Sequence, residues 1–153
     1  MKITLQDLIK KYACKEGKKW FKKNFREETD IETLKNKLIE QKEWDYLEWL
    51  YISFNLTGEY IEFYDNKKTK RKYHYKDGKL HGKYVWFYEN GRVWEKFFCK
   101  NGKREGKTII FDEDGKVREK GFYKDGRREG EYIEFYEDGK VKKCFYKDGE
   151  RIR

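Results

Sequence analysis

Few residues in this sequence could carry out chemistry, and their spacing does not indicate a reaction centre. The two histidines, His74 and His81, lie seven residues apart with no cysteine nearby, which is not the spacing of a zinc site. The three cysteines, Cys14, Cys99 and Cys144, are widely scattered. An odd number at such spacings predicts neither a disulfide framework nor a metal site. We therefore expect no metal ion and no cofactor.

Other catalytic arrangements are also missing. The phosphate-binding pattern G-x-G-x-x-G is absent, and the glycines fall instead in predicted hairpin turns. With only two histidines, no Ser-His-Asp or Cys-His arrangement is indicated. Carboxylates such as Glu62 and Glu134 recur at equivalent positions of a repeat, where a solvated strand face explains them. We expect a protein that is not an enzyme.

A set of aromatic residues favours binding over catalysis. Rigid rings with polar tips, surrounded by Lys, Arg and Glu, have the composition of contact hot spots. The predicted partner-binding residues are Tyr60, Tyr64, Tyr84, Trp86, Tyr88, Tyr132 and Tyr136. The alternative is that these rings pack against the N-terminal helices or against neighbouring strands.

A second candidate surface is basic. Its five cations crowd one short stretch: Lys67, Lys68, Lys70, Arg71 and Lys72. The chain has a net charge of +9, most of it in the second part of the sequence. Aromatic residues interleaved with cations can stack bases and follow a phosphate backbone, so nucleic acid is the alternative partner. An anionic membrane surface comes third and is not favoured, and a charge run in an irregular hairpin is usually just solvated.

These residues are positioned by a repeat. Gly58, Gly82, Gly106 and Gly130 are each 24 residues apart, and the same plan of two apolar runs and two turns follows each of them. A fixed period of this length is typical of a repeat architecture. The first run alternates, so one face of a sheet is expected to be buried. Its predicted core residues are Ile61, Val85, Ile109 and Ile133, with Phe63, Phe87, Phe111 and Phe135.

The second run and the turns follow the same period. Phe98, Phe122 and Phe145 share a core-type position that His74 occupies in the first unit. Each unit ends in a turn of Asp-Gly or Asn-Gly, and a similar pair follows the first run in three units. Such pairs predict type I′ hairpin turns. The first unit has Asn66-Lys67 there, so we expect a looser hairpin, and the shorter fourth unit is expected to fray.

The pattern G-x-Y-x-x-F-Y-x-x-G-x-V-x-x-x-x-F-Y-K-D-G closely resembles the MORN repeat in its bacterial variant form, over residues 58–153. The resemblance implies an elongated antiparallel sheet of stacked hairpins, with the helical segment covering one end. It also implies binding roles, namely scaffolding, contact with partner proteins or contact with anionic phospholipids. Several bacterial relatives are classed as antitoxin-like. No catalytic residues come with the resemblance.

The first part of the chain predicts short helices. Thr4 and Asp30 are plausible N-caps, a second helix is expected to enter near Gly17, and a fourth to begin near Glu43. Their apolar residues recur three or four apart, and three tryptophans are predicted to be core: Trp20, Trp44 and Trp49. Cys14 is predicted to be a small buried residue. The segment resembles a helical module found in bacterial and phage proteins, some of them immunity-like.

The sequence as a whole predicts an α+β protein with a helical module over residues 1–54 and hairpin repeats over residues 55–153. The predicted function is non-catalytic binding of a protein partner, as a stoichiometric inhibitor, immunity or antitoxin-type protein of bacterial or phage origin, counter-defence included. A homodimer is possible through the last sheet edge, near residues 144–147. No apolar run approaches the roughly 20 residues that span a bilayer, and we expect a cytoplasmic protein.

Overall fold

The computed structural model describes residues 1–152 and confirms the predicted α+β class. The chain divides into two compact domains, the first ending at Leu56 and the second beginning at Thr57. The boundary expected from the sequence lay two residues earlier, after residue 54. Among the described residues, no helix is long and apolar enough to cross a membrane.

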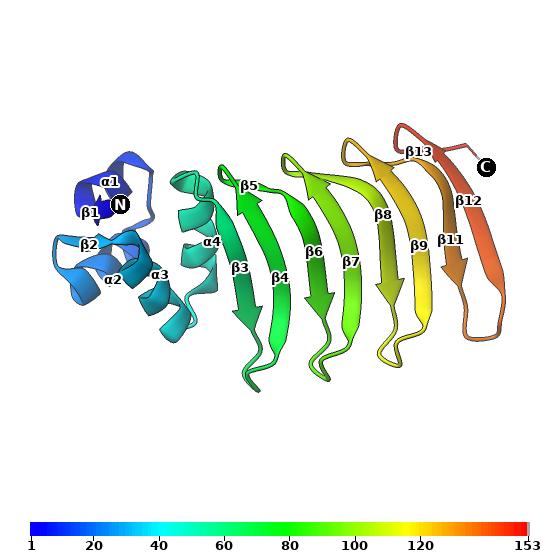
Figure 1. Ribbon diagram of the computed structural model, residues 1–153, viewed down its shortest axis with the longest axis horizontal. Coiled ribbons are helices and arrows are strands. Elements are labelled where there is room, and N and C mark those ends of the chain that lie inside the picture. Colours follow the sequence, from blue (N-terminus) through cyan, green and yellow to red (C-terminus); the bar gives the residue numbers. More distant parts are fainter. Residues whose placement is uncertain (153) are drawn as a thin grey trace. The chain divides into compact units, whose positions relative to one another are not determined.

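The first domain, which we call the helical domain, contains four helices and a two-stranded antiparallel sheet (Figure 1). Its elements are β1 (Lys2–Thr4), α1 (Leu5–Lys10), α2 (Lys15–Phe25), β2 (Glu28–Asp30), α3 (Ile31–Glu40) and α4 (Trp44–Ser53). The four helices were expected, whereas the pairing of β1 with β2 was not. Every helix contributes buried residues, and Ile3 of β1 and Ala13 are buried as well. Those from the helices are Leu8, Phe21, Leu34, Leu38, Leu47, Leu50 and Tyr51.

Side-chain caps fix where three of these helices begin. Thr4 forms a capping box with Asp7 at the start of α1, and Asp30 accepts two backbone N–H groups at the start of α3, both as predicted. The second helix begins earlier than expected, because Cys14 is its N-cap and accepts the N–H of Gly17. Cys14 is therefore exposed at a helix end, and the prediction that it is buried is wrong.

The second domain is one large antiparallel sheet of successive hairpins, as Figure 1 shows, and each of its four repeat units forms one hairpin. Its long strands are β3 (Gly58–Phe63), β4 (Thr69–Lys76), β6 (Gly82–Phe87), β7 (Val93–Lys100), β8 (Lys103–Phe111), β9 (Val117–Lys124), β11 (Gly130–Phe135) and β12 (Val141–Lys147). Three short strands pair with the ends of neighbours: β5 (Lys79–Leu80), β10 (Arg127–Arg128) and β13 (Glu150–Arg151). Because β13 pairs with Tyr146 and Lys147, the last edge is partly covered where we expected it to be open.

The two kinds of turn differ in geometry. The turns that end each unit have both central residues at positive φ, as in Asp77-Gly78 at 50° and 73°, which confirms the type I′ prediction. In the turns inside the last three units only the glycine is left-handed, as at Gly91, whose N–H donates to the carbonyl of Tyr88, so the type I′ prediction is wrong for these turns. That pattern is a type I turn followed by a left-handed residue.

The first unit forms the same inner turn without a glycine. Lys67 takes the left-handed position at φ 65°, and its N–H donates to the carbonyl of Tyr64. The expectation of a looser hairpin is therefore wrong, because the backbone bonds of this turn match those of the other three units.

The missing residue of the fourth unit removes a β-bulge. In the first three units the pairing shifts by one residue just before the last residue of the first strand, so that Lys70, Trp94 and Arg118 are left over. The pairing of β11 with β12 has no such shift. The shorter fourth unit therefore forms a regular hairpin, and the prediction that it frays is wrong.

The buried face of the sheet is the opposite of the one predicted. Tyr60 is only 1% exposed and Tyr84 is also buried, whereas Phe63 on the other face is exposed. The predicted core residues Ile61, Val85, Ile109, Phe87, Phe111 and Phe135 are half-buried, and Ile133 alone among the eight is buried. Both faces carry apolar residues at a period of two, so alternation alone could not assign the inside.

Candidate functional site

The buried face is built from rings stacked across strands. Tyr60, Tyr73, Tyr84 and Phe97 follow one another over four neighbouring strands, with ring centroids 4.6, 4.5 and 4.5 Å apart. We call this side of the sheet the ring-stack face. Each stacked pair contributes about 0.5–1.5 kcal/mol beyond the burial of its rings. The stack ends at Thr108, which is buried at the next equivalent position.

Arginine side chains cover these rings and form ion pairs with glutamates. Arg71 pairs with the buried Glu62, and its guanidinium lies 5.5 Å from the centroid of Tyr60. Arg104 donates to Glu95 at 2.7 Å while lying 3.9 Å from the Phe97 ring. Buried carboxylates on this face are therefore neutralised by cations that also cover the aromatic rings.

The fourth unit continues this face with a different contact. Tyr132 lies over Gly121 and donates a 2.6 Å hydrogen bond to Glu119. Burial, reinforced by that hydrogen bond, raises the pKa of Tyr132, so its hydroxyl remains a donor at neutral pH.

Most of the predicted partner-binding residues serve the sheet itself. Tyr60, Tyr84 and Tyr132 are buried, which corrects their assignment to a contact surface. Tyr64 and Tyr88 are half-buried and donate to the carbonyls of Phe87 and Phe111 in the next unit.

The remaining two predicted contact residues are more accessible. Trp86 is half-buried, donates its indole N–H to Tyr84 and stacks on Trp94 at 4.7 Å. Tyr136 is 48% exposed and donates to Glu134. Two accessible side chains do not make a continuous surface on this face.

The predicted basic patch is not one surface either. Lys70 and Arg71 both pair with Glu62, whereas Lys72 pairs with Glu59 on the other face of the sheet. Lys67 and Lys68 lie in the turn, where the amine of Lys68 donates to the carbonyl of Asn90. The run in the sequence is therefore divided between two faces and a turn, and three of its cations are already ion-paired.

The face opposite the ring stack carries exposed rings that the sequence reading assigned to the core. Phe98 and Phe122 are 45% and 42% exposed, and Phe145 is exposed at the equivalent position of the last unit. Their cross-strand partners on one side are Lys83, Lys107 and Glu131 respectively. On its other side Phe98 faces Glu105, whose carboxylate accepts the backbone N–H of Asp125. We call this side the open face. The recurrence of these three Phe residues at one position of the repeat was visible in the sequence, but it did not indicate which face of the sheet they occupy.

The charges on the open face change along the sheet. In the first and last units, Glu59 pairs with Lys72 at 2.8 Å and Glu131 pairs with Lys143 at 2.9 Å. The two middle units have lysine at the position of those glutamates. The exchange adds Lys83 and Lys107 beside Lys96 and Lys120, which are equivalent to Lys72 and Lys143 of the outer units. We call these four cations the central lysines: Lys83, Lys96, Lys107 and Lys120. Within the described residues, no carboxylate forms an ion pair with them.

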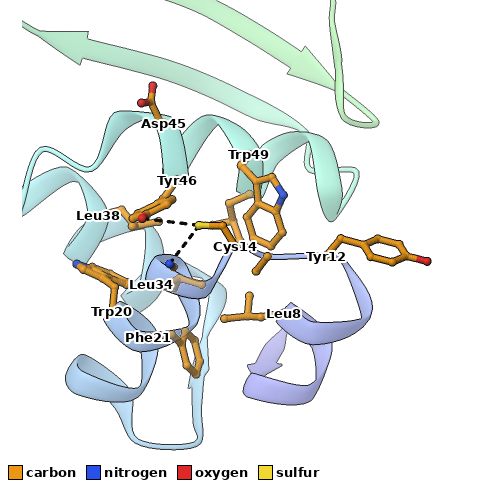
Figure 2. Close-up of a pocket in the computed structure, with 13 residues that line it drawn as sticks. Leu8, Tyr12, Cys14, Trp20, Phe21, Leu34, Leu38, Asp45, Tyr46 and Trp49 are labelled. Carbon is orange, nitrogen blue, oxygen red and sulfur yellow. Dashed lines mark hydrogen bonds between the residues drawn. The ribbon is translucent and has the colours of Figure 1, made fainter.

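The helical domain contains a separate apolar pocket of about 300 Å³. Leu8, Trp20 and Trp49 are among its lining residues, and Figure 2 shows them around Cys14. The Cys14 thiol lies 3.9 Å from the hydroxyl of Tyr46, to which it donates. The three tryptophans expected in the core are half-buried, and two of them line this pocket.

The remaining candidate residues do not form a reaction centre. His74 is exposed and faces Glu59 across the strands, and His81 packs against Phe98 with ring centroids 6.3 Å apart. Cys99 and Cys144 are buried, and burial raises the pKa of the Cys99 thiol. Residues 1–152 contain no group of three or more His, Cys, Asp or Glu side chains that could hold a metal ion.

Comparison with known families agrees with this architecture. Each hairpin matches the MORN repeat variant, over residues 56–77, 80–101, 104–125 and 128–148. The chain belongs to the MORN-repeat family. Residues 1–54 of this MORN-repeat protein match the YdhT N-terminal domain, so the helical domain and the repeat domain each match a known family.

Comparison with individual proteins adds little. No curated protein matches this MORN-repeat protein. Among solved structures, a mutant of S. aureus TarM in complex with fondaparinux, alpha-GlcNAc-glycerol and UDP is similar, with a TM-score of 0.39 and 18% identity. The match covers 92% of this chain and 31% of TarM. A likeness at this level carries no inference about function.

Proposed function

We propose that this MORN-repeat protein is a non-catalytic module that binds a protein partner through its sheet. The observation that supports the proposal is the open face, where half-exposed Phe rings alternate with lysines across neighbouring strands. Aromatic rings held on a rigid sheet lose little conformational entropy on binding, and Phe is among the aromatic residues enriched in protein interfaces.

The form of binding that fits a small basic chain is stoichiometric. We propose that the protein occupies its partner one to one, as an inhibitor, immunity or antitoxin-type protein of bacterial or phage origin, counter-defence included. The family resemblance supports a binding role, and the accessible open face supplies a surface for it. No reaction step is required of any residue.

Co-purification tests this proposal. The full chain carrying an affinity tag is expressed in its native host, and proteins that copurify at physiological salt are weighed and identified. We expect one partner in a fixed ratio, and its recovery should fall with the variant Phe98→Ser, Phe122→Ser. Thermal unfolding of that variant serves as the control for folding. A chain that purifies alone at the mass of its own oligomer contradicts the proposal.

Nucleic-acid binding is the second candidate, favoured by the unpaired central lysines beside exposed rings. Binding of single-stranded DNA or RNA through such cations falls steeply as salt rises. A filter-binding titration at low and physiological salt tests this candidate, and the absence of binding at low salt removes it.

A further inference from the structure

One register position on the open face divides the four repeats into two kinds. It holds Glu59 and Glu131 in the outer repeats and Lys83 and Lys107 in the inner ones. In the outer repeats the glutamate neutralises a lysine of the neighbouring strand. In the inner repeats two lysines therefore lie beside each exposed ring, one across from it and one in its own strand. These rings, Phe98 and Phe122, are more exposed than Phe145 of the last repeat.

The lysines and rings of the inner repeats form one mixed surface. Lys83 lies across from Phe98 and Lys107 across from Phe122. The amines of Lys96 and Lys120 lie 5.0 and 5.3 Å from the ring centroids of Phe111 and Phe135, respectively. Charges held against apolar rings are partly shielded from water, which strengthens their attraction for an opposite charge.

We propose that this central part of the open face is the docking site for an acidic protein segment. Its carboxylates pair with the central lysines, and its apolar side chains cover Phe98 and Phe122. The inference rests on the proposed function and specifies its surface and the chemistry of the partner.

The geometry favours a protein over the other anionic partners. Two repeats span about 20 Å, because neighbouring strands lie about 4.8 Å apart. The patch is closed on both sides by the ion pairs of Glu59 and Glu131, so it suits a short segment better than a continuous phosphate backbone. The rings at Phe98 and Phe122 are less than half exposed, which leaves little apolar surface to insert into a bilayer.

The spacing also defines a probe. Equivalent rings on successive repeats are two strands apart, about 10 Å, which is close to the rise of one three-residue turn of a polyproline II helix. A fluorescein-labelled peptide that repeats Glu-Glu-Phe therefore presents one ring per repeat and carboxylates between them. Its affinity is measured by fluorescence anisotropy with the full chain.

The decisive variant gives the inner repeats the residues of the outer ones. In Lys83→Glu, Lys107→Glu, the new carboxylates can pair with Lys96 and Lys120 as Glu59 pairs with Lys72. We expect the fold and thermal stability to be retained and peptide binding to weaken at least about tenfold. The matched control, Lys15→Glu, Lys19→Glu, makes the same charge change on the exposed surface of α2 and should alter binding less than about twofold.

Each outcome decides the inference. Equal losses in the two variants, or no loss in either, overturn it, because attraction is then general or lies elsewhere. Tighter binding of an oligothymidine or of phosphatidylserine vesicles, lost in Lys83→Glu, Lys107→Glu, assigns the patch to nucleic acid or lipid and also overturns it.

The host experiment separates this inference from the proposed function. A stoichiometric host partner recovered equally by wild type and by Lys83→Glu, Lys107→Glu keeps the proposed function and overturns the docking site. The expected peptide result without any host partner keeps the site and counts against the proposed function.

Discussion

At the scale of single residues, the tightest constraint lies at Gly121. A methyl group there would lie 2.7 Å from Cε2 of Tyr132, whose ring covers this backbone position. The ring is held by its hydrogen bond to Glu119 and cannot move away without losing it. The ring-stack face therefore depends on a residue without a side chain at this point.

We predict that Gly121→Ala lowers the free energy of unfolding by about 2 kcal/mol, because the added group overpacks the site. Urea denaturation measures the loss. The control is a double-mutant cycle with Tyr132→Ala, in which the ring is gone and the alanine should cost little more. An equal cost of Gly121→Ala with and without the ring would show that the contact is not responsible.

A second residue-scale prediction concerns Asp30. A 2.5 Å hydrogen bond from the Thr33 hydroxyl, with backbone N–H donors, lowers the pKa of this carboxyl. Because the folded pKa is depressed, the stabilisation is present above the unfolded pKa and is lost as pH falls through the folded value. We expect Thr33→Val to raise the pKa of Asp30 toward its ordinary value, so that α3 loses its cap at a higher pH.

An NMR titration of the carboxyl groups measures this shift. Asp7 is the internal control, since its pKa is lowered by Thr4 and should stay where it is in the variant. A parallel shift of both residues would indicate a general change of the unit rather than loss of one hydrogen bond.

For single residues, the prediction of which side chains are buried was the least accurate. Alternation correctly grouped Tyr60 with Tyr84 and Phe63 with Phe87, but it could not say which group is inside. The deciding contacts are cross-strand, such as Arg71 over Tyr60, and they depend on a pairing that the sequence does not reveal. As a result, predicted contact residues proved to be buried, and predicted core residues proved to be accessible.

At the scale of elements, local chemistry made the prediction reliable. Caps at Thr4 and Asp30 and the turns at Asp77-Gly78 and its equivalents were predicted, because short-range hydrogen bonds and φ preferences determine them. The pairing of β1 with β2 was missed because each strand has only three residues and the partners lie far apart in the sequence.

The inner turn of the first repeat gives a prediction at this scale. Lys67 occupies a left-handed position that glycine fills in the other three repeats, and a side chain there costs about 1 kcal/mol. We expect Lys67→Gly to raise the free energy of unfolding by about that amount, and Gly91→Lys to lower it similarly. Lys67→Ala, which removes the charge and keeps the Cβ, is the control and should change little in urea denaturation.

At the scale of the whole molecule, the sheet is a linear array in which each hairpin pairs only with its neighbours. Stability in such arrays is a sum of unit and nearest-neighbour contributions, so damage should remain local. We predict that Gly121→Ala speeds amide hydrogen exchange in β8, β9 and β11 and leaves β3 and β4 unchanged. Uniform acceleration throughout the sheet would show instead that the array unfolds as one cooperative unit.

The four-ring stack has an optical consequence. Tyr60, Tyr73, Tyr84 and Phe97 hold their planes within 14° of one another at each step. Chromophores this close and this parallel share their electronic excitations, so they add their own bands to the circular dichroism spectrum. Helix and strand contents fitted from that spectrum will therefore be distorted, and loss of these bands on heating will report the disruption of the first two repeats in particular.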